Sequence, residues 1–325
     1  MTAAELESLA SLAEGVVRRD PGAVARAISL VEDRRRSAEA TTVALLHVIA
    51  EASDPLRATR VGVTGPPGVG KSSLVSALVL ATRKSGRTVG VLAVDPSSPR
   101  SGGALLGDRA RMDIDPDDLG LYVRSMASGG DLGGLARAAG AAIDILGAAY
   151  DVVYVETTGV GQSETDVEHV ADTVLLVIQP GSGDVLQFLK AGIIEIPDVF
   201  AVNKADLGAI AERAHAELAA ALSAVHVGDG SPSPAIIATS ATTSAGVDSL
   251  LATLDAHRTQ LVESGSLAGR RARATIAWAY RLFVQKWGEY GVEEAGGRDA
   301  VSAALAQRIG NGIPALEAIA EIRPR

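Results

Sequence analysis

A glycine-rich loop that begins at residue 65 is the segment of this sequence with the clearest chemical meaning. It reads Gly65-Pro66-Pro67-Gly68-Val69-Gly70-Lys71-Ser72 and fits the pattern G-x-x-x-x-G-K-S/T. In such a loop, successive backbone N–H groups turn inward and surround phosphate oxygens at the start of a helix. Lys71 would contact the β- and γ-phosphates, and the Ser72 hydroxyl would bind Mg²⁺. Because an apolar run precedes the loop and helical spacing follows it, we interpret it as a phosphate loop rather than an ordinary glycine-rich turn.

A second loop, Asn203-Lys204-Ala205-Asp206, follows another apolar run and fits N-K-x-D. Its aspartate carboxylate can accept hydrogen bonds from the N1–H and the exocyclic amine of guanine. Adenine lacks this pair of donors, so an unpaired carboxylate would disfavour it. The tetrapeptide alone is also compatible with a turn and a helix cap, but its place downstream of a phosphate loop indicates guanine binding. Ser240-Ala241-Thr242 is expected to supply a backbone contact to the guanine carbonyl.

Two apolar runs end in acidic residues, Asp95 and Glu156. Glu156 and Gly159 resemble the D-x-x-G of G proteins, with Glu in place of Asp. The carboxylate would act on Mg²⁺ or its bound water, and the Gly159 N–H would contact the γ-phosphate. The alternative is a buried strand that merely ends in a surface glutamate. Val160 stands where Ras-type proteins have the glutamine that orients water, so we expect slow intrinsic hydrolysis that responds to a partner.

The elements that position these loops alternate between short apolar runs and helical patterns. Roughly 60 residues, with a predicted helix over 132–147, separate Asp95 from Glu156. Their strands should therefore both run parallel to the phosphate-loop strand, as in the signal-recognition and metallochaperone branch of P-loop GTPases. The predicted class is α/β, a P-loop GTPase with a mostly parallel sheet flanked by helices. The apolar runs are Val61–Val63, Val89–Val94, Val152–Val155, Val174–Ile178, Val199–Val202 and Ile236–Ile237.

Helical extensions are predicted on both sides of this domain. Residues 1–55 form an N-terminal helical extension, 56–260 the GTPase domain, and 261–325 a C-terminal helical region for dimerisation. In the last region Gly291, Gly296-Gly297 and 310–312 are expected to interrupt the helices. An aromatic and aliphatic stripe there is interpreted as a subunit interface, the alternative being that it packs on the protein's own core. The stripe consists of Ile276, Tyr280, Phe283, Trp287 and Tyr290.

The composition of the chain limits its possible partners, metal sites and cellular compartment. The 325 residues carry a formal net charge of -9, which argues against a nucleic-acid partner. There is no cysteine, which excludes disulfides and thiolate metal sites. The acidic N-terminus does not resemble a signal peptide, and no run approaches the roughly 18 apolar residues of a membrane span. We therefore expect a cytoplasmic protein with no membrane association.

Several motifs together resemble one family, the methylmalonyl-CoA mutase-associated GTPases of the MeaB and ArgK type, which include the human methylmalonic aciduria type A protein. The likeness extends to Val24–Glu32 and the C-terminal helices, and so covers nearly the whole chain. Thr158 is a small departure, since the family commonly has Val there. The motifs are the segments 65–73, 94–99, 107–109, 156–164 and 203–206.

The resemblance implies a homodimeric GTPase chaperone of an adenosylcobalamin-dependent acyl-CoA mutase. Such a chaperone gates cofactor loading and protects or reactivates the mutase, and a cobalamin adenosyltransferase is a further possible partner. The resemblance also implies a third switch over Gln179–Lys190, with Asp184, Gln187 and Lys190 as relays. The expected magnesium ligands are Ser72, Asp95, Asp108 and Glu156. The expected catalytic residues are Lys71, Asp95, Asp108, Glu156 and Gly159. The nucleotide, GTP or GDP, is expected to contact residues 65–72, Ser73, Asn203, Lys204, Asp206, Ser240, Ala241 and Thr242.

Three other functions are compatible with parts of the sequence. A nickel-type metallochaperone GTPase shares the fold class, but it would need clustered cysteine and histidine ligands. The five histidines here are scattered. An ATP-dependent kinase of amino-acid transport is a legacy label of this family, and the guanine loop argues against it. A scaffold that binds nucleotide without hydrolysing it also stays open, because motifs alone do not establish hydrolysis.

Overall fold

A seven-stranded parallel sheet forms the centre of the computed structural model, which describes residues 2–95, 118–127, 135, 137–157, 166–181, 195–225 and 233–324. The strand order is β3-β2-β4-β1-β5-β6-β7. The predicted α/β class with a parallel sheet is thereby confirmed. The strands that end at Asp95 and Glu156 are neighbours, and both run parallel to the phosphate-loop strand, as expected. The strands are β1 Thr59–Thr64, β2 Val89–Asp95, β3 Leu121–Ala127, β4 Val152–Glu156, β5 Thr173–Ile178, β6 Val199–Val202 and β7 Ala235–Ala238.

The strand β3, which lies at one edge of the sheet, was not predicted from the sequence. It pairs with β2 over its whole length, from Val89 opposite Leu121 to Asp95 opposite Ala127. Only Val123 and Met126 are buried in it. The half-buried Arg124 and Ser125 interrupt its apolar residues, and a continuous apolar run was the signal used for the other six strands.

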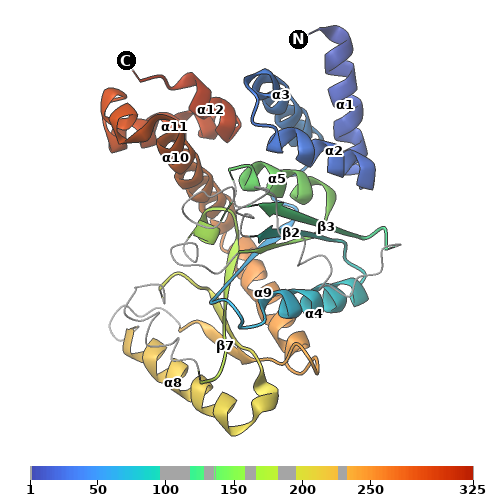
Figure 1. Cartoon of the computed structure of the whole chain (residues 1–325), viewed down its shortest axis with the longest axis vertical. Helices are drawn as coiled ribbons and strands as arrows, with labels where there is room; N and C mark the ends of the chain where they lie inside the picture. Colours follow the sequence, from blue (N-terminus) through green and yellow to red (C-terminus); the bar gives the residue numbers. More distant parts are fainter. Residues whose placement is uncertain are drawn as a thin grey trace, which may run out of the picture.

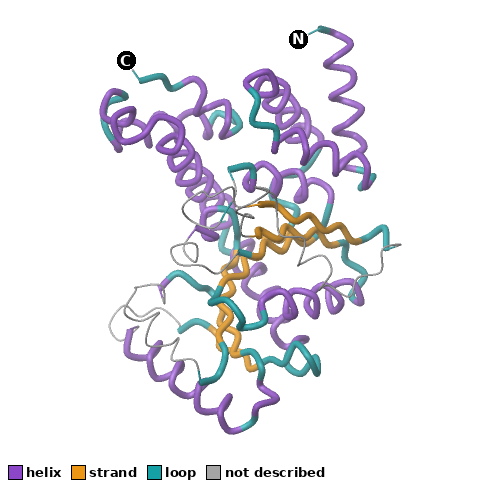
Figure 2. The backbone as a smooth tube through the Cα atoms, in the orientation of Figure 1, coloured by secondary structure: helices purple, strands orange, loops and turns teal. Residues whose placement is uncertain are grey.

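Helices cover both faces of the sheet. Alternate residues of a strand point to opposite faces, and β4 shows this: Tyr154 packs with α4 (Lys71–Lys84) and α9 (Val247–Glu263), whereas Val153 and Val155 pack with α5 (Ala139–Ala149). The chain also forms α8 (Ala209–Val225), which packs on β6 and β7. Figures 1 and 2 show α4 and α9 side by side beneath the strands, with α5 across the sheet from them.

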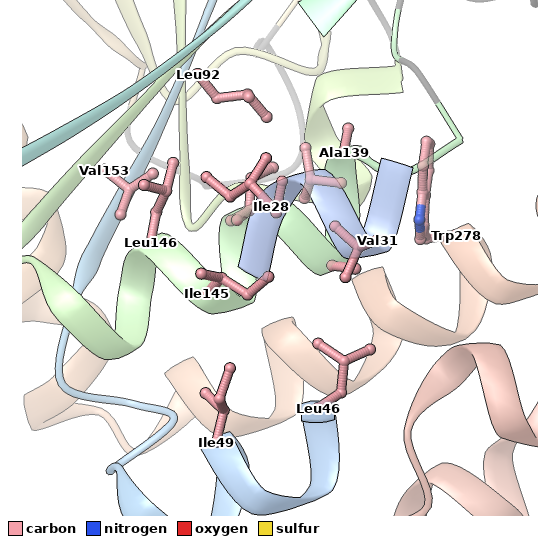
Figure 3. Close-up of a cluster of buried hydrophobic side chains, with 14 of the residues drawn as sticks. Ile28, Val31, Leu46, Ile49, Leu92, Ala139, Ile145, Leu146, Val153 and Trp278 are labelled. Carbon is pink, nitrogen blue, oxygen red and sulfur yellow. The ribbon is translucent and has the colours of Figure 1, made fainter. Parts of the chain in front are cut away.

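Three N-terminal helices lie over α5. They are α1 (Ala3–Val17), α2 (Pro21–Glu32) and α3 (Arg36–Ala52). Asp20 caps α2 by accepting a hydrogen bond from the Ala23 N–H at 2.6 Å, and Pro21 occupies the first turn, where its missing N–H costs nothing. In Figure 3, Leu46 and Ile49 point from α3 toward the side of α5 that bears Ile145. The helix α5 is therefore covered by the sheet on one side and by the N-terminal helices on the other.

The C-terminal part contains α10 (Ser266–Glu294), α11 (Arg298–Gly310) and α12 (Ala315–Glu321). The breaks at Gly296-Gly297 and at 310–312 are confirmed. The break expected at Gly291 was wrong, because that residue is helical. The helix kinks instead at Gly288, which has φ 69° and ψ 178°. Glycine tolerates this left-handed φ, so the bend falls there.

The aromatic stripe of α10 divides between the core and the surface. Phe283 is fully buried within this chain, together with the neighbouring Trp278. Trp287 is 38% exposed and Tyr290 is 73% exposed. The first half of the stripe thus packs on the protein's own core, and the second half does not.

Both helical extensions lie at the same end of the molecule, opposite α8 (Figure 1). A hydrogen bond and an ion pair join them: His47 Nε2 lies 2.6 Å from Glu317 Oε2, and Lys286 Nζ lies 3.2 Å from Glu39 Oε1. Residues of α1–α3, α5 and α10–α12 belong to one continuous apolar cluster. Within the described ranges, no helix combines the length and apolar character that crossing a membrane requires.

Candidate nucleotide site

The phosphate loop joins the end of β1 to the start of α4. Its three glycines have left-handed φ values, with Gly65 at 141°, Gly68 at 82° and Gly70 at 94°. A Cβ at Gly65 would lie 2.1 Å from the carbonyl oxygen of Val177 in β5, so no side chain fits there. The Lys71 ammonium donates to the carbonyl oxygens of Gly65 at 2.8 Å and Pro66 at 3.0 Å. The lysine therefore lies against the loop that would surround the phosphates.

Asn203 connects the phosphate loop with the two loops expected to hold the base. Its Nδ2 donates to the Val69 carbonyl at 2.9 Å, and its Oδ1 accepts from the Ala241 N–H at 3.2 Å. The side chain is buried. A Cβ at Gly70 would meet Asn203 Nδ2 at 2.6 Å, which explains why glycine is needed at that position. One buried amide thus fixes the spacing between the phosphate and guanine loops.

Lys204 bridges the guanine loop to two other elements. Its ammonium donates to the Gly68 carbonyl at 3.0 Å and to Gln179 Oε1 at 2.5 Å. The backbone of Lys204 is left-handed, with φ 62°. This turn leads into a short 3₁₀ helix, η3 (Ala205–Leu207), in which Asp206 is exposed. The Asp206 carboxylate is consequently accessible to a base.

The third loop follows β7 and lies beside Asn203. The Thr239 carbonyl accepts from the Ala205 N–H at 2.9 Å, which joins this loop to the guanine loop. Ser240 is buried and its Oγ accepts from the Thr243 N–H at 3.2 Å. Ala241 is half-buried and Thr242 is exposed. The structure therefore places Ser240-Ala241-Thr242 beside the loop that begins at Asn203.

Oxygen atoms that could bind a metal ion lie beside the phosphate loop, at the carboxyl ends of β4 and β2. Ser72 Oγ donates to Glu156 Oε1 at 2.7 Å. Glu156 of β4 lies opposite Ala93 of β2, and Asp95 lies two residues beyond Ala93 at the end of β2. Both carboxylates are buried. Magnesium is usually held by one or two carboxylates together with waters and substrate phosphates, so this donor set fits Mg²⁺.

Several predicted residues fall outside the described part of the chain. They are Asp108, Thr158, Gly159, Val160, Asp184, Gln187 and Lys190. Within the described part, Pro66 is half-buried, and Pro67 and Ser73 are exposed beside the loop.

Two contacts that hold the site together were not predicted from the sequence. One is the bond between Lys204 and Gln179. The other is Thr157, whose N–H donates to the Val63 carbonyl at 3.1 Å and whose Oγ1 donates to Thr64 Oγ1 at 3.2 Å. These contacts join the end of β4 to β1. A threonine just after a strand carries no distinctive pattern, so sequence alone gave no signal for it.

Residues 24–289 match the sequence pattern of a protein family described as methylmalonyl-CoA mutase-associated GTPase MeaB. The chain belongs to this family. The match to the MeaB family begins in α2 and continues into α10, so it includes every loop described above. It covers most of the chain, in agreement with the resemblance seen in the sequence.

Relatives of the MeaB-family chain carry related names. A protein of Pyrococcus horikoshii named as a GTPase is 45% identical over 270 residues, which are 82% of this chain and 83% of the relative. The mouse mitochondrial methylmalonic aciduria type A homolog is 37% identical over 279 residues, 82% of this chain and 67% of that protein. The GTPase ArgK of Escherichia coli is 35% identical over 280 residues, 83% of this chain and 82% of that protein.

A crystal structure of an LAO/AO transport system kinase has a similar fold. It matches with a TM-score of 0.67 and 26% identity, covering 99% of this chain and 98% of that one. The relatives named as GTPases, together with the P-loop fold, identify this MeaB-family chain as a GTPase that binds GTP and GDP.

Proposed function

We propose that this GTPase is a chaperone of an adenosylcobalamin-dependent acyl-CoA mutase, with methylmalonyl-CoA mutase as the first candidate. It gates loading of the cofactor and protects or reactivates the mutase. The observation that carries this proposal is the MeaB family match over residues 24–289, whose description names the mutase. The relationship to the mouse methylmalonic aciduria type A homolog supports it. We further propose a homodimer in the cytoplasm, with a cobalamin adenosyltransferase as a second partner.

The proposed site uses each loop for one part of GTP. Backbone N–H groups of residues 65–70 and the Lys71 ammonium bind the phosphates, and Asp206 selects guanine. Ser72, Asp95, Glu156 and Asp108 would hold Mg²⁺, which supplies charge neutralisation at the β- and γ-phosphates when bound. In this structure Ser72 and Glu156 are hydrogen-bonded to each other, so both oxygens already lie beside the phosphate loop.

Release of phosphate from GTP and ATP, with and without the mutase, tests the proposal. We expect slow turnover of GTP alone, faster turnover with mutase, and little turnover of ATP. Lys71→Ala should abolish hydrolysis because the lysine neutralises phosphate charge. Lys84→Ala is the matched control, since Lys84 is exposed at the far end of the same helix. Turnover that no acyl-CoA mutase changes, with no complex detected in any nucleotide state, would contradict the chaperone function.

The proposed third switch is tested separately by Gln187→Ala. We expect this variant to bind GDP as wild type does and to lose the stimulation by mutase. If stimulation is unchanged in Gln187→Ala, Asp184→Ala and Lys190→Ala, these residues are not the relays.

A further inference from the structure

We propose that a cavity between the two helical extensions is a binding site for a small carboxylate with an apolar body. The cavity has a volume of about 210 Å³ and is bounded by α3, α5, α10 and the turn that leads into α12. It lies on the face of the sheet opposite α4, the helix that follows the phosphate loop. It is therefore a site separate from the nucleotide loops.

The walls of the cavity are mostly apolar. Leu46 and Ile49 come from α3, Ile143 from α5, Trp278 from α10, and Ile313 from the turn before α12. Figure 3 shows Leu46, Ile49 and Trp278 around the helix α5. An apolar cavity of about 150 Å³ is known to hold benzene. The larger cavity here has room for a ring or a branched chain of similar size, together with one carboxylate.

The indole of Trp278 lies against α5 because residue 140 is a glycine. A Cβ at Gly140 would lie 2.6 Å from Trp278 Nε1 and 2.9 Å from its Cδ1. The ring is only 5% exposed, so it forms a fixed wall rather than a mobile side chain. A fixed aromatic wall favours a flat or branched apolar group over a long flexible chain.

The polar groups of the cavity favour an anion. Arg60 pairs with Asp144 at 2.9 Å through one guanidinium nitrogen, while its buried Nε has no hydrogen-bond acceptor within the described residues. Arg137 also lines the cavity. Its side chain is exposed and forms no ion pair with any residue that the structure describes. Burial, followed by the charge of Arg281, lowers the pKa of His169, so this ring is neutral at pH 7. The cavity lining thus contains two guanidinium groups and one carboxylate, and the excess positive charge favours a carboxylate ligand.

The cavity also touches the segment that links the magnesium region to β5. His169 and Val170 line it, at the end of the 3₁₀ helix η1 (Val167–His169). Asp166, just before η1, pairs with Arg281 of α10. A Cβ at Gly62 of β1 would lie 2.2 Å from Val167, so η1 packs directly on the phosphate-loop strand. A ligand in the cavity therefore contacts an element packed on the strand that leads into the phosphate loop.

Binding is tested with the full chain in its GDP form, using phenylacetate and 3-methylbutanoate as probes and phenylacetamide as the neutral analogue. Ligand-observed NMR and calorimetry measure the affinity. We expect saturable binding of the carboxylates at millimolar concentration and much weaker binding of the amide. Arg137→Gln should weaken binding about tenfold, because a charge-assisted hydrogen bond is lost. Arg213→Gln, an exposed arginine on α8 away from the cavity, should have no effect.

A filling variant supplies an independent check. Ala315→Phe places a ring in the cavity from a half-buried position at the start of α12 and should abolish binding while GDP affinity is kept. The proposal is overturned if neither carboxylate binds saturably, if the amide binds as tightly, or if both cavity variants bind as wild type does. GTP turnover should change with phenylacetate in wild type and not in Ala315→Phe. Unchanged turnover despite binding would overturn the link to η1 and leave the site itself supported.

Discussion

Gly65 sets the distance between the phosphate loop and the strand β5. Its φ is 141°, and a Cβ there would lie only 2.1 Å from the Val177 carbonyl oxygen, so there is no room for a side chain. We predict that Gly65→Ala lowers the free energy of unfolding by about 3 kcal/mol or more, from overpacking and backbone strain together. Gly68→Ala is the control, because φ is also left-handed there but nothing lies within 4 Å of its Cβ position. It should cost only about 1 to 2 kcal/mol. Urea unfolding measures both, and equal losses would show that the approach to Val177 is not limiting.

Asp206 is predicted to determine the choice of base. Asp206→Asn replaces a carboxylate acceptor by an amide, which suits the carbonyl at position 2 of xanthine better than the amine of guanine. We expect roughly hundredfold weaker GDP binding and a gain in affinity for xanthosine diphosphate. Asp248→Asn, an exposed aspartate on α9, should leave both affinities unchanged. Calorimetry with the two nucleotides and ADP measures the effect; equal affinity of the wild type for ADP and GDP would contradict it.

Sequence motifs predicted the loops that meet at the carboxyl ends of β1, β4 and β6, but not all the bonds that join them. Each nucleotide loop has a spacing that chemistry restricts, so Lys71, Glu156 and Asp206 could be found in advance. The contacts of Lys204 with Gly68 and Gln179 depend on β5 lying between β1 and β6. That order is a property of the whole sheet, and no local pattern encodes it.

At the scale of elements, Asp172 at the start of β5 joins α10 to the sheet. Its carboxylate accepts from Arg271 at 2.6 and 2.5 Å and from the Arg60 N–H at 3.0 Å, and it is fully buried. Removing one partner of such a buried pair leaves the other charge uncompensated. We therefore predict that Asp172→Asn lowers the free energy of unfolding by about 3 to 5 kcal/mol.

The same carboxylate gives an acid dependence of stability. Burial alone would raise the pKa of Asp172, but the hydrogen bonds and charge of Arg271 outweigh burial and lower it. The folded protein then binds this proton less readily than the unfolded chain. Its contribution is present above the unfolded pKa of about 3.9 and is lost as pH falls through the lower folded value. Urea unfolding over a pH series should show a smaller acid loss in Asp172→Asn than in Asp299→Asn, an exposed control on α11. An identical acid loss in both variants would contradict this assignment.

Two features that sequence patterns missed, the strand β3 and the position of the bend in α10, depend on their place in the folded chain. The edge strand β3 buries too few side chains to form an apolar run, and the bend of α10 falls at Gly288 instead of Gly291. Both glycines have the same intrinsic freedom, and tertiary packing decides which one bends. Gly291 stays helical, with Trp287 close on one side and Pro324 on another.

At the scale of the whole molecule, the exposed end of the aromatic stripe is the predicted subunit interface. Phe283 belongs to the core, so Trp287 and Tyr290 are the exposed members of the stripe that a second copy could contact. Trp287→Asp combined with Tyr290→Asp should convert a dimer to a monomer that still binds GDP, because aromatic anchors dominate such interfaces. Val262→Asp, which alters a similarly exposed side chain on α9, should remain dimeric. Light scattering of the three proteins measures this, and a wild type that is monomeric at micromolar concentration would contradict it.

The continuous cluster around α5 has a consequence for how the chain matures on the ribosome. Helices α1–α3 are made first, yet all three pack on α5, which is synthesised roughly 100 residues later. The three N-terminal helices can pack on one another as soon as they are made. At about 5 to 20 residues per second, they wait on the order of ten seconds for α5. During that interval they are a target for nascent-chain chaperones and proteases. Chains truncated before α5 should therefore be degraded, and slow translation of the first half should lower the yield of folded protein.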